Sequence, residues 1–171
     1  VAQASGGRRP GHPLEWHLSR FVPPMQIARW MHLMGVVVWI GGMFFAHFAL
    51  RPAAQALPPA VRLPLLAATL SRFFVWAGVA VLAVLASGVW LSEAMGGFRT
   101  AGAAIHAMTA IGLVMALVYA YIVTGPYRRL KAAVADARWE AAAPAMAVIR
   151  RLVGLNLALG LVTIAVAVLG G

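Results

Sequence analysis

Four long apolar runs divide the sequence, and each is long enough to cross a membrane. The runs cover about residues 26–50, 68–92, 102–125 and 148–169. About 20 apolar residues at ~1.5 Å each span the ~30 Å hydrocarbon core of a bilayer. None of the runs alternates polar and apolar residues, as the strand of a membrane β-barrel would. The pattern therefore predicts an all-α integral membrane protein whose four transmembrane helices form an up-and-down bundle in the lipid bilayer.

The segments between the runs are short and contain most of the proline and basic residues. Residues 1–24 are rich in Arg, Gly and Pro and are expected to form a flexible N-terminal extension, which leaves 25–171 as the membrane domain. The first helix is expected to end at residues 51–52, where a charge meets a proline. A linker is expected at 58–64. The connector at 127–152 has basic residues at helical spacing, so we expect it to lie partly along the membrane interface.

The composition agrees with this prediction and limits the possible binding partners. The chain has 63% apolar residues, 11% charged residues and a formal net charge of +10. Because the basic residues lie mostly between the apolar runs, they are typical of topology signals and of contact with anionic lipids, which argues against nucleic acid as a partner. The absence of cysteine excludes disulfides and thiolate metal sites, and leaves His, Met and carboxylates as metal ligands. A homo-oligomer is left open.

The distribution of Lys and Arg predicts the orientation in the membrane. Nine of them lie on the side of the connectors that follow the first and third runs, and five lie on the opposite side. Cytoplasmic segments carry an excess of Lys and Arg, so the side with nine is predicted to be cytoplasmic. Both termini are then expected in the periplasm of a bacterial inner membrane.

Two histidines are the main candidates for chemistry. His32 and His106 lie about five residues inside the starts of the first and third runs, which run in the same direction, so both sit roughly 7 to 8 Å below the same surface. Histidine is costly inside a membrane and usually has a function there. Two imidazoles on different helices at one depth are suited to hold haem b between them, one on each face of the iron. Gly35 and Trp39 share the helix face of His32, and we expect them to admit and pack the ring.

The surrounding residues complete the haem hypothesis. Arg29 and Arg99 lie near the same surface and are expected to pair with haem propionates. His47 lies about 22 Å further along the first run, where no other histidine reaches, so a structural, proton-relay or metal-binding role is left open for it. The residues thus predict a b-type haem protein, and by extension a haem-dependent membrane oxidoreductase, that exchanges electrons with a quinone or a porphyrin-type partner.

Copper handling is the main alternative. The chain has eight methionines, and the thioether is a soft ligand that suits Cu(I). Met31 and Met34 flank His32 in the sequence but point about 100° or more away from it, while Met25 shares its face. A purely structural membrane subunit, in which small residues pack helices and histidines form hydrogen bonds, is the third possibility.

Three stretches resemble a known family. They read HLMGVVVWIGGMFF at 32–45, RFFVWAGVAVL at 72–82 and RLVGLNLALG at 151–160. These stretches are similar to CopD-like membrane proteins and to their HemJ-type relatives, the four-span protoporphyrinogen oxidases. The CopD resemblance implies copper uptake or resistance. The HemJ resemblance implies a four-helix bundle with haem b and with His32 as a key residue, but Met108 follows His106 where HemJ-type proteins have Lys, which removes a fixed cation from the site.

Overall fold

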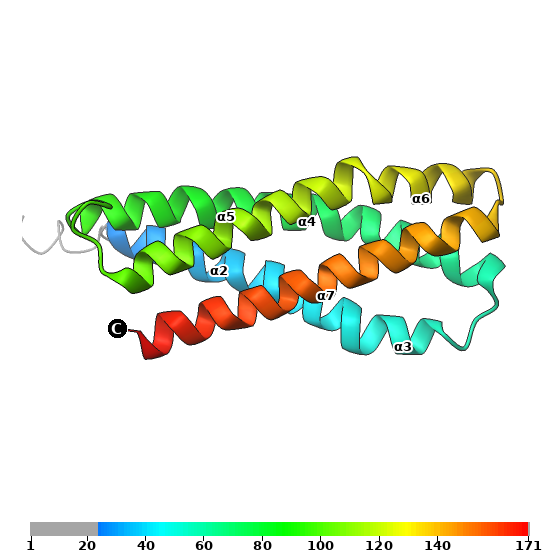
Figure 1. Ribbon diagram of the computed structural model, residues 1–171, viewed down its shortest axis with the longest axis horizontal. Coiled ribbons are helices and arrows are strands. Elements are labelled where there is room, and N and C mark those ends of the chain that lie inside the picture. The colour runs from blue at the N-terminus through cyan, green and yellow to red at the C-terminus, as the bar shows by residue number, and fades with distance from the viewer. Residues whose placement is uncertain (1–23, 171) are drawn as a thin grey trace, which may run out of the picture.

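The computed structural model describes residues 24–170, and this part of the chain is helical throughout apart from short loops (Figure 1). The predicted N-terminal extension lies outside the described residues except for Pro24. Four helical stretches of 31 to 36 residues are long and apolar enough to cross a membrane, which confirms the predicted all-α membrane protein. The helices are α2 (Pro24–Phe45), α3 (Arg51–Ala54), α4 (Pro59–Ala94), α5 (Ala103–Thr124), α6 (Pro126–Ala135) and α7 (Trp139–Leu169), and the π-helical segment η1 (Ala46–Leu50) joins α2 to α3.

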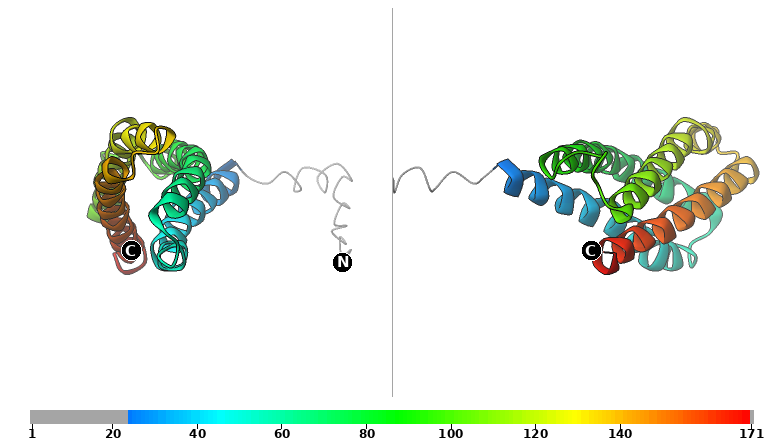
Figure 2. Two further views of the ribbon diagram at one scale, coloured as in Figure 1. Left: turned by 90° about the vertical axis from the view of Figure 1, so that its right-hand side faces the viewer. Right: turned by 60° about the vertical axis from the view of Figure 1, so that its left-hand side comes forward.

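The helices form two antiparallel pairs. α2 packs along α4, and α5 together with α6 packs along α7. The two pairs face each other, with α7 crossing α2 near its middle (Figure 1), and the end-on view shows the helices arranged around one interior (Figure 2). Successive long helices run in opposite directions, so the up-and-down order is confirmed.

Three prolines that were expected to lie in linkers or at a helix end lie within helices. α4 begins at Pro59 because a proline is well tolerated in the first turn, where its missing N–H has no helical partner. Pro64 lies five residues further on, and the helix continues through it. Pro52 does not end the first helix either, because the wider π-helical turn before it changes the backbone that the ring would meet. The predicted linker at 58–64 is therefore mostly helical.

The basic connector extends the bundle instead of lying beside it. Gly125 (φ −107°, ψ −93°) and Pro126 bend the chain, and α6 then continues in nearly the direction of α5 (Figure 1). α6 packs along the first turns of α7 and against α4. Its buried face carries Tyr127, Leu130 and Ala133, which are three residues apart, and its basic side chains are exposed on the other face. We expected the connector to lie partly along the membrane interface, and only this exposed basic face is free to do so.

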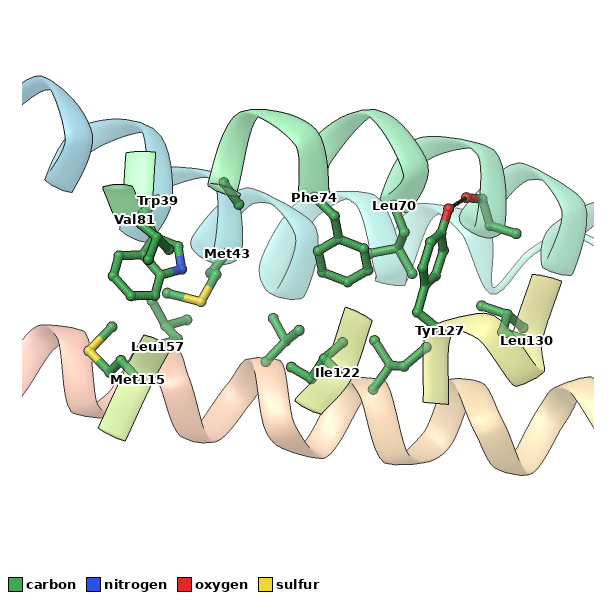
Figure 3. Close-up of a cluster of buried hydrophobic side chains, with 14 of the residues drawn as sticks. Trp39, Met43, Leu70, Phe74, Val81, Met115, Ile122, Tyr127, Leu130 and Leu157 are labelled. Carbon is green, nitrogen blue, oxygen red and sulfur yellow. Dashed lines mark hydrogen bonds between the residues drawn. The ribbon is translucent and has the colours of Figure 1, made fainter. Parts of the chain in front are cut away.

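The interior is apolar along the full length of the bundle. Trp39, Met43, Met115 and Leu157 meet in one half, and Phe74 and Tyr127 continue the cluster into the other half (Figure 3). The outer surface is also apolar, with large aliphatic side chains exposed on every long helix. A helix that is hydrophobic all round is typical of a membrane span, because the outer side chains contact lipid.

One polar side chain is buried in this interior without a complete set of partners. Asn156 of α7 is 2% exposed. Its Nδ2 donates a hydrogen bond to the backbone carbonyl of Met115, at 3.0 Å. Its Oδ1 has no hydrogen-bond partner among the described residues. A buried acceptor that is left unpaired costs about 1 to 3 kcal/mol, whereas a hydrogen bond within a membrane protein contributes only about 0.6 kcal/mol.

Asn156→Leu is therefore expected to raise the free energy of unfolding by about 1 kcal/mol. Leu has the same branching and the same number of non-hydrogen side-chain atoms, so it fills the site while removing the unpaired oxygen. Unfolding of the detergent-solubilised protein would measure the change. Asn156→Ala is the control, because it removes the same polar atoms but leaves a void and gives no such gain. Equal losses of stability in both variants would show that Oδ1 has a partner.

Candidate functional site

His32 lies on the side of α2 that faces the bundle, and it contacts α4. The buried residues Trp39 and Met43 follow it by seven and eleven positions, which places them within about 20° of it around the helix. Its Nδ1 lies 3.1 Å from the Oγ of Ser87. Gly88 lies beside the ring, because a Cβ at that position would be 3.5 Å from the Cε1 of His32. The imidazole is therefore fixed against one site on α4.

The hydrogen bonds of Ser87 favour one tautomer of His32, with the proton on Nδ1. The Ser87 hydroxyl donates to the Ala83 carbonyl of its own helix, and the Val84 carbonyl lies 3.2 Å away. A hydroxyl has one hydrogen, so its oxygen is left to accept a hydrogen bond from Nδ1–H of His32. The Nε2 of His32 then carries the lone pair. A neutral imidazole whose other N–H is held by a hydrogen bond is the form in which histidine binds metal ions.

The space expected for a macrocycle beside His32 is filled by α4. Gly35 is buried, and a Cβ there would lie 2.7 Å from Cγ2 of Val84 and 3.1 Å from the Ala80 carbonyl oxygen. Trp39 is 4% exposed and belongs to the hydrophobic core. Gly35 thus allows α2 to pack closely on α4, and Trp39 packs into the bundle interior. A flat ring that approaches this face of α2 would have to displace Val84.

The structure does not bring His106 together with His32. His106 is exposed near the start of α5, and its Nδ1 lies 3.2 Å from the carbonyl of Gly102, the N-cap residue of this helix. It precedes the buried residue Met115 by nine positions, which places it about half a turn away from the side of α5 that faces the bundle. Ligation of haem b by His32 and His106 stays a prediction, and it would need α5 to rotate.

The two arginines expected at haem propionates are both exposed. Arg29 lies in the second turn of α2, and Arg99 lies in the loop between α4 and α5, at the same end of the bundle (Figure 1). Gly96 and Gly97 lie near the start of this loop and have φ values of 110° and 83°, which favour glycine. Pairing of either arginine with an anionic group at this end stays a prediction.

A second candidate site surrounds His47 at the opposite end of the bundle. A cavity of about 230 Å³ is lined by His47 of η1 and by Met146 of α7. The His47 ring packs edge-on against Phe48, with 5.0 Å between centroids. Gly154 of α7 leaves room for the imidazole, because a Cβ there would lie 3.3 Å from its Cε1. π-Helical turns such as the one that carries His47 are frequent at functional sites.

The charged residues that line this cavity are all basic. Arg51 of α3, Arg62 of α4 and Arg150 of α7 line it together with the side chain of Gln55. The three arginines come from separate helices, and in the sequence they indicated only the orientation of the protein in the membrane.

Sequence analysis did not identify Met146 and Ser87 as site residues either, because only the packing of the helices brings them close to His47 and His32. The one local signal was the Ser-Gly pair at positions 87 and 88 inside an apolar run.

Within residues 24–170, no three His, Asp or Glu side chains gather closely enough to hold a metal ion. A metal ion at His32 or His47 would therefore need thioether, backbone or solvent ligands besides the imidazole. Of these ligands, thioether sulfur together with imidazole suits Cu(I), whereas backbone and solvent oxygen suit harder ions.

Comparison with known proteins identifies the family. The family model of copper resistance protein D matches residues 67–169, from the third turn of α4 to the end of α7. No curated protein and no solved structure matches the chain. The CopD part of the resemblance is therefore confirmed, whereas a HemJ-type relationship stays a prediction. Because the match covers more than half of the sequence, the chain belongs to the copper resistance protein D family.

Proposed function

We propose that this chain is a membrane protein of copper uptake or copper resistance and that His32 contacts the copper ion. The match of residues 67–169 to copper resistance protein D is the observation that carries the proposal. The hydrogen bond from His32 to Ser87 supports the choice of residue, because it leaves Nε2 free to bind a metal ion.

The register between α2 and α4 supports a route for copper from the membrane surface to His32. The facing pairs are Gly42 with Phe73, Gly35 with Val84 and His32 with Gly88. Each step towards the start of α2 thus corresponds to a step towards the end of α4. Continued for about two turns, this register brings Met25 level with Met95, roughly 10 Å above His32. Thioether sulfur and imidazole nitrogen are both ligands that Cu(I) prefers.

Electrostatics argues against His47 as the copper contact. Met146 could supply a thioether in that cavity, but Arg51, Arg62 and Arg150 line it as well. A guanidinium 6 to 8 Å from a cation opposes binding by about 2 to 3 kcal/mol at an effective dielectric constant of 20. Because three arginines line the cavity, their combined repulsion disfavours a cation there. No arginine is among the contacts of His32 on α4, and Arg29, one turn before His32 on α2, is exposed to solvent, which screens its charge.

We further propose that the protein lies in a bacterial inner membrane with the start of α2 and the end of α7 facing the periplasm. The excess of Lys and Arg at the opposite end supports this orientation. Copper would then meet Met25, Met95 and His32 from the periplasmic side, and the His47 cavity would lie at the cytoplasmic side.

The proposal is tested by measuring Cu(I) affinity of the purified protein in competition with a chromogenic Cu(I) chelator. His32→Ala is expected to weaken binding at least tenfold, or about 1.4 kcal/mol, because it removes the nitrogen ligand. Ser87→Ala keeps the imidazole of His32 but removes the hydrogen bond that favours the proton on Nδ1, so a smaller loss of Cu(I) affinity is expected. His106→Ala is the matched control, since it removes an exposed histidine at similar depth and should leave the affinity unchanged.

Two results would contradict the proposal. Wild-type affinity in a folded His32→Ala variant would remove His32 from the copper site, and a wild-type protein that binds no Cu(I) would remove copper altogether. A Soret band that both the His32 and the His106 variants lose would instead support the haem b hypothesis, together with its quinone or porphyrin partner.

A further inference from the structure

The cavity around His47 joins an apolar floor to a cationic rim. Its floor consists of aliphatic side chains of α4 and α7, namely Leu63, Leu66, Leu70, Ile149 and Val153. Its polar lining comes from the turn η1–α3, from the first turn of α4 and from the first half of α7. With about 230 Å³, the cavity is much larger than the space needed by a single water molecule.

Among residues 24–170, none of the three arginines of this rim forms an ion pair. Arg51 and Arg62 are half-buried, and Arg150 is exposed. The described residues that line the cavity include no Asp or Glu. In the part of the chain that the structure describes, the one ion pair joins Arg138 to Asp136 in the α6–α7 turn. Three guanidinium groups beside one cavity repel each other, so an anion bound between them would relieve an unfavourable arrangement.

Topology alone does not explain these positions. A basic residue that only orients a membrane protein can lie anywhere on the cytoplasmic side in contact with water or lipid headgroups. Arg128 and Arg129 on the exposed face of α6 meet that requirement. Arg51, Arg62 and Arg150 instead come from three helices to the edge of one cavity, where the imidazole of His47 and the amide of Gln55 add further hydrogen-bond donors.

The chemistry of the lining selects the ligand. Guanidinium groups bind phosphate oxygens with two parallel hydrogen bonds, so the rim suits a phosphate group. A free phosphate ion would leave the aliphatic floor without a partner, whereas an acyl chain fills it. A phospholipid with a choline headgroup would bring a cation next to the arginines, so an anionic headgroup fits better.

We propose that this cavity binds an anionic membrane phospholipid, with its phosphate group held by Arg51, Arg62 and Arg150 and the start of an acyl chain lying on the aliphatic floor. The proposal is independent of copper binding, because it uses neither His32 nor the family match. It also gives His47 a role as a donor to the phosphate.

Thermal unfolding of the purified protein in detergent, with and without added lipid, tests the proposal. Phosphatidylglycerol is expected to raise the unfolding midpoint of the wild type by several degrees, and phosphatidylcholine much less. Arg62→Gln with Arg150→Gln should lose most of this shift. Arg128→Gln with Arg129→Gln is the matched control, since it removes the same charge from the same end of the bundle but not from the cavity.

Several results would overturn the proposal. Equal shifts in the two double variants would show surface electrostatics only, and an equal shift with phosphatidylcholine would show no preference for anionic lipid. The same shift with inorganic phosphate at equal ionic strength would assign the site to the free ion. If the cavity variant does not fold, native mass spectrometry of the wild type decides: retention of phosphatidylglycerol over phosphatidylcholine supports the site, and equal retention refutes it.

Discussion

Gly35→Leu is expected to separate α2 from α4 and to lower the free energy of unfolding by about 2 to 3 kcal/mol. A Cβ at this position would lie 2.7 Å from Cγ2 of Val84 and 3.1 Å from the backbone carbonyl oxygen of Ala80. The Val84 side chain can rotate away, but the backbone of α4 can only move as a whole. Overpacking of a close helix contact typically costs 1 to 3 kcal/mol, and a leucine adds three more carbons beyond the Cβ.

Gly41→Leu is the matched control for this variant. Gly41 lies on the same helix, and a Cβ there would meet nothing within 4 Å. The control also receives the same gain in helix propensity, so the difference between the two variants isolates the clash. Thermal unfolding in detergent, followed by circular dichroism, measures both. Equal stability of the two variants would mean that α2 and α4 are further apart than the structure places them.

Leu130→Ala is expected to destabilise the protein by about 2 to 5 kcal/mol. Leu130 is fully buried in α6, next to Tyr127 in the apolar cluster that joins α6 to α4 and α7 (Figure 3). Truncation removes buried methyl groups and leaves a cavity that the surrounding helices fill only in part. The size of the loss therefore tests whether the basic connector is part of the bundle.

Leu117→Ala supplies the comparison on α5. Leu117 is 70% exposed on the outer surface, so the same truncation there removes contacts with lipid or detergent instead of core packing. We expect its effect on the unfolding free energy to stay within about 0.5 kcal/mol. If Leu130→Ala is equally mild, α6 lies loosely at the membrane surface, as the amphipathic sequence of the connector alone would suggest.

Sequence analysis correctly predicted the features of the fold that depend on a single helix. The lengths of the four apolar runs follow from local composition, and the shared face of His32, Gly35 and Trp39 follows from the helical period. These residues do lie on one face, although that face is packed against α4 and the core. The ends of the helices were harder to predict, because the tolerance of Pro52 and Pro64 depends on the neighbouring turns.

The candidate sites depend on how helices rotate against each other, which the sequence does not contain. The predicted depth of His106 follows from residue counting, whereas the direction of its side chain follows from packing. The exposed position of His106 is set by Met115 and Ile122, which turn the opposite side of α5 to the bundle. The cavity around His47 was unpredictable for the same reason, since its arginines come from three helices.

The π-helical segment η1 has a consequence for how relatives of this chain can vary. A π-helical turn holds one residue more than an α-helical turn, so it amounts to an insertion absorbed within a helix. Loss of one residue from Ala46–Leu50 would restore an α-helical turn and leave the helical segments on either side of it in nearly the same register. A relative that is one residue shorter between Met43 and Arg51 is therefore expected to keep Arg51 at the cavity and to lose only the widened turn that carries His47.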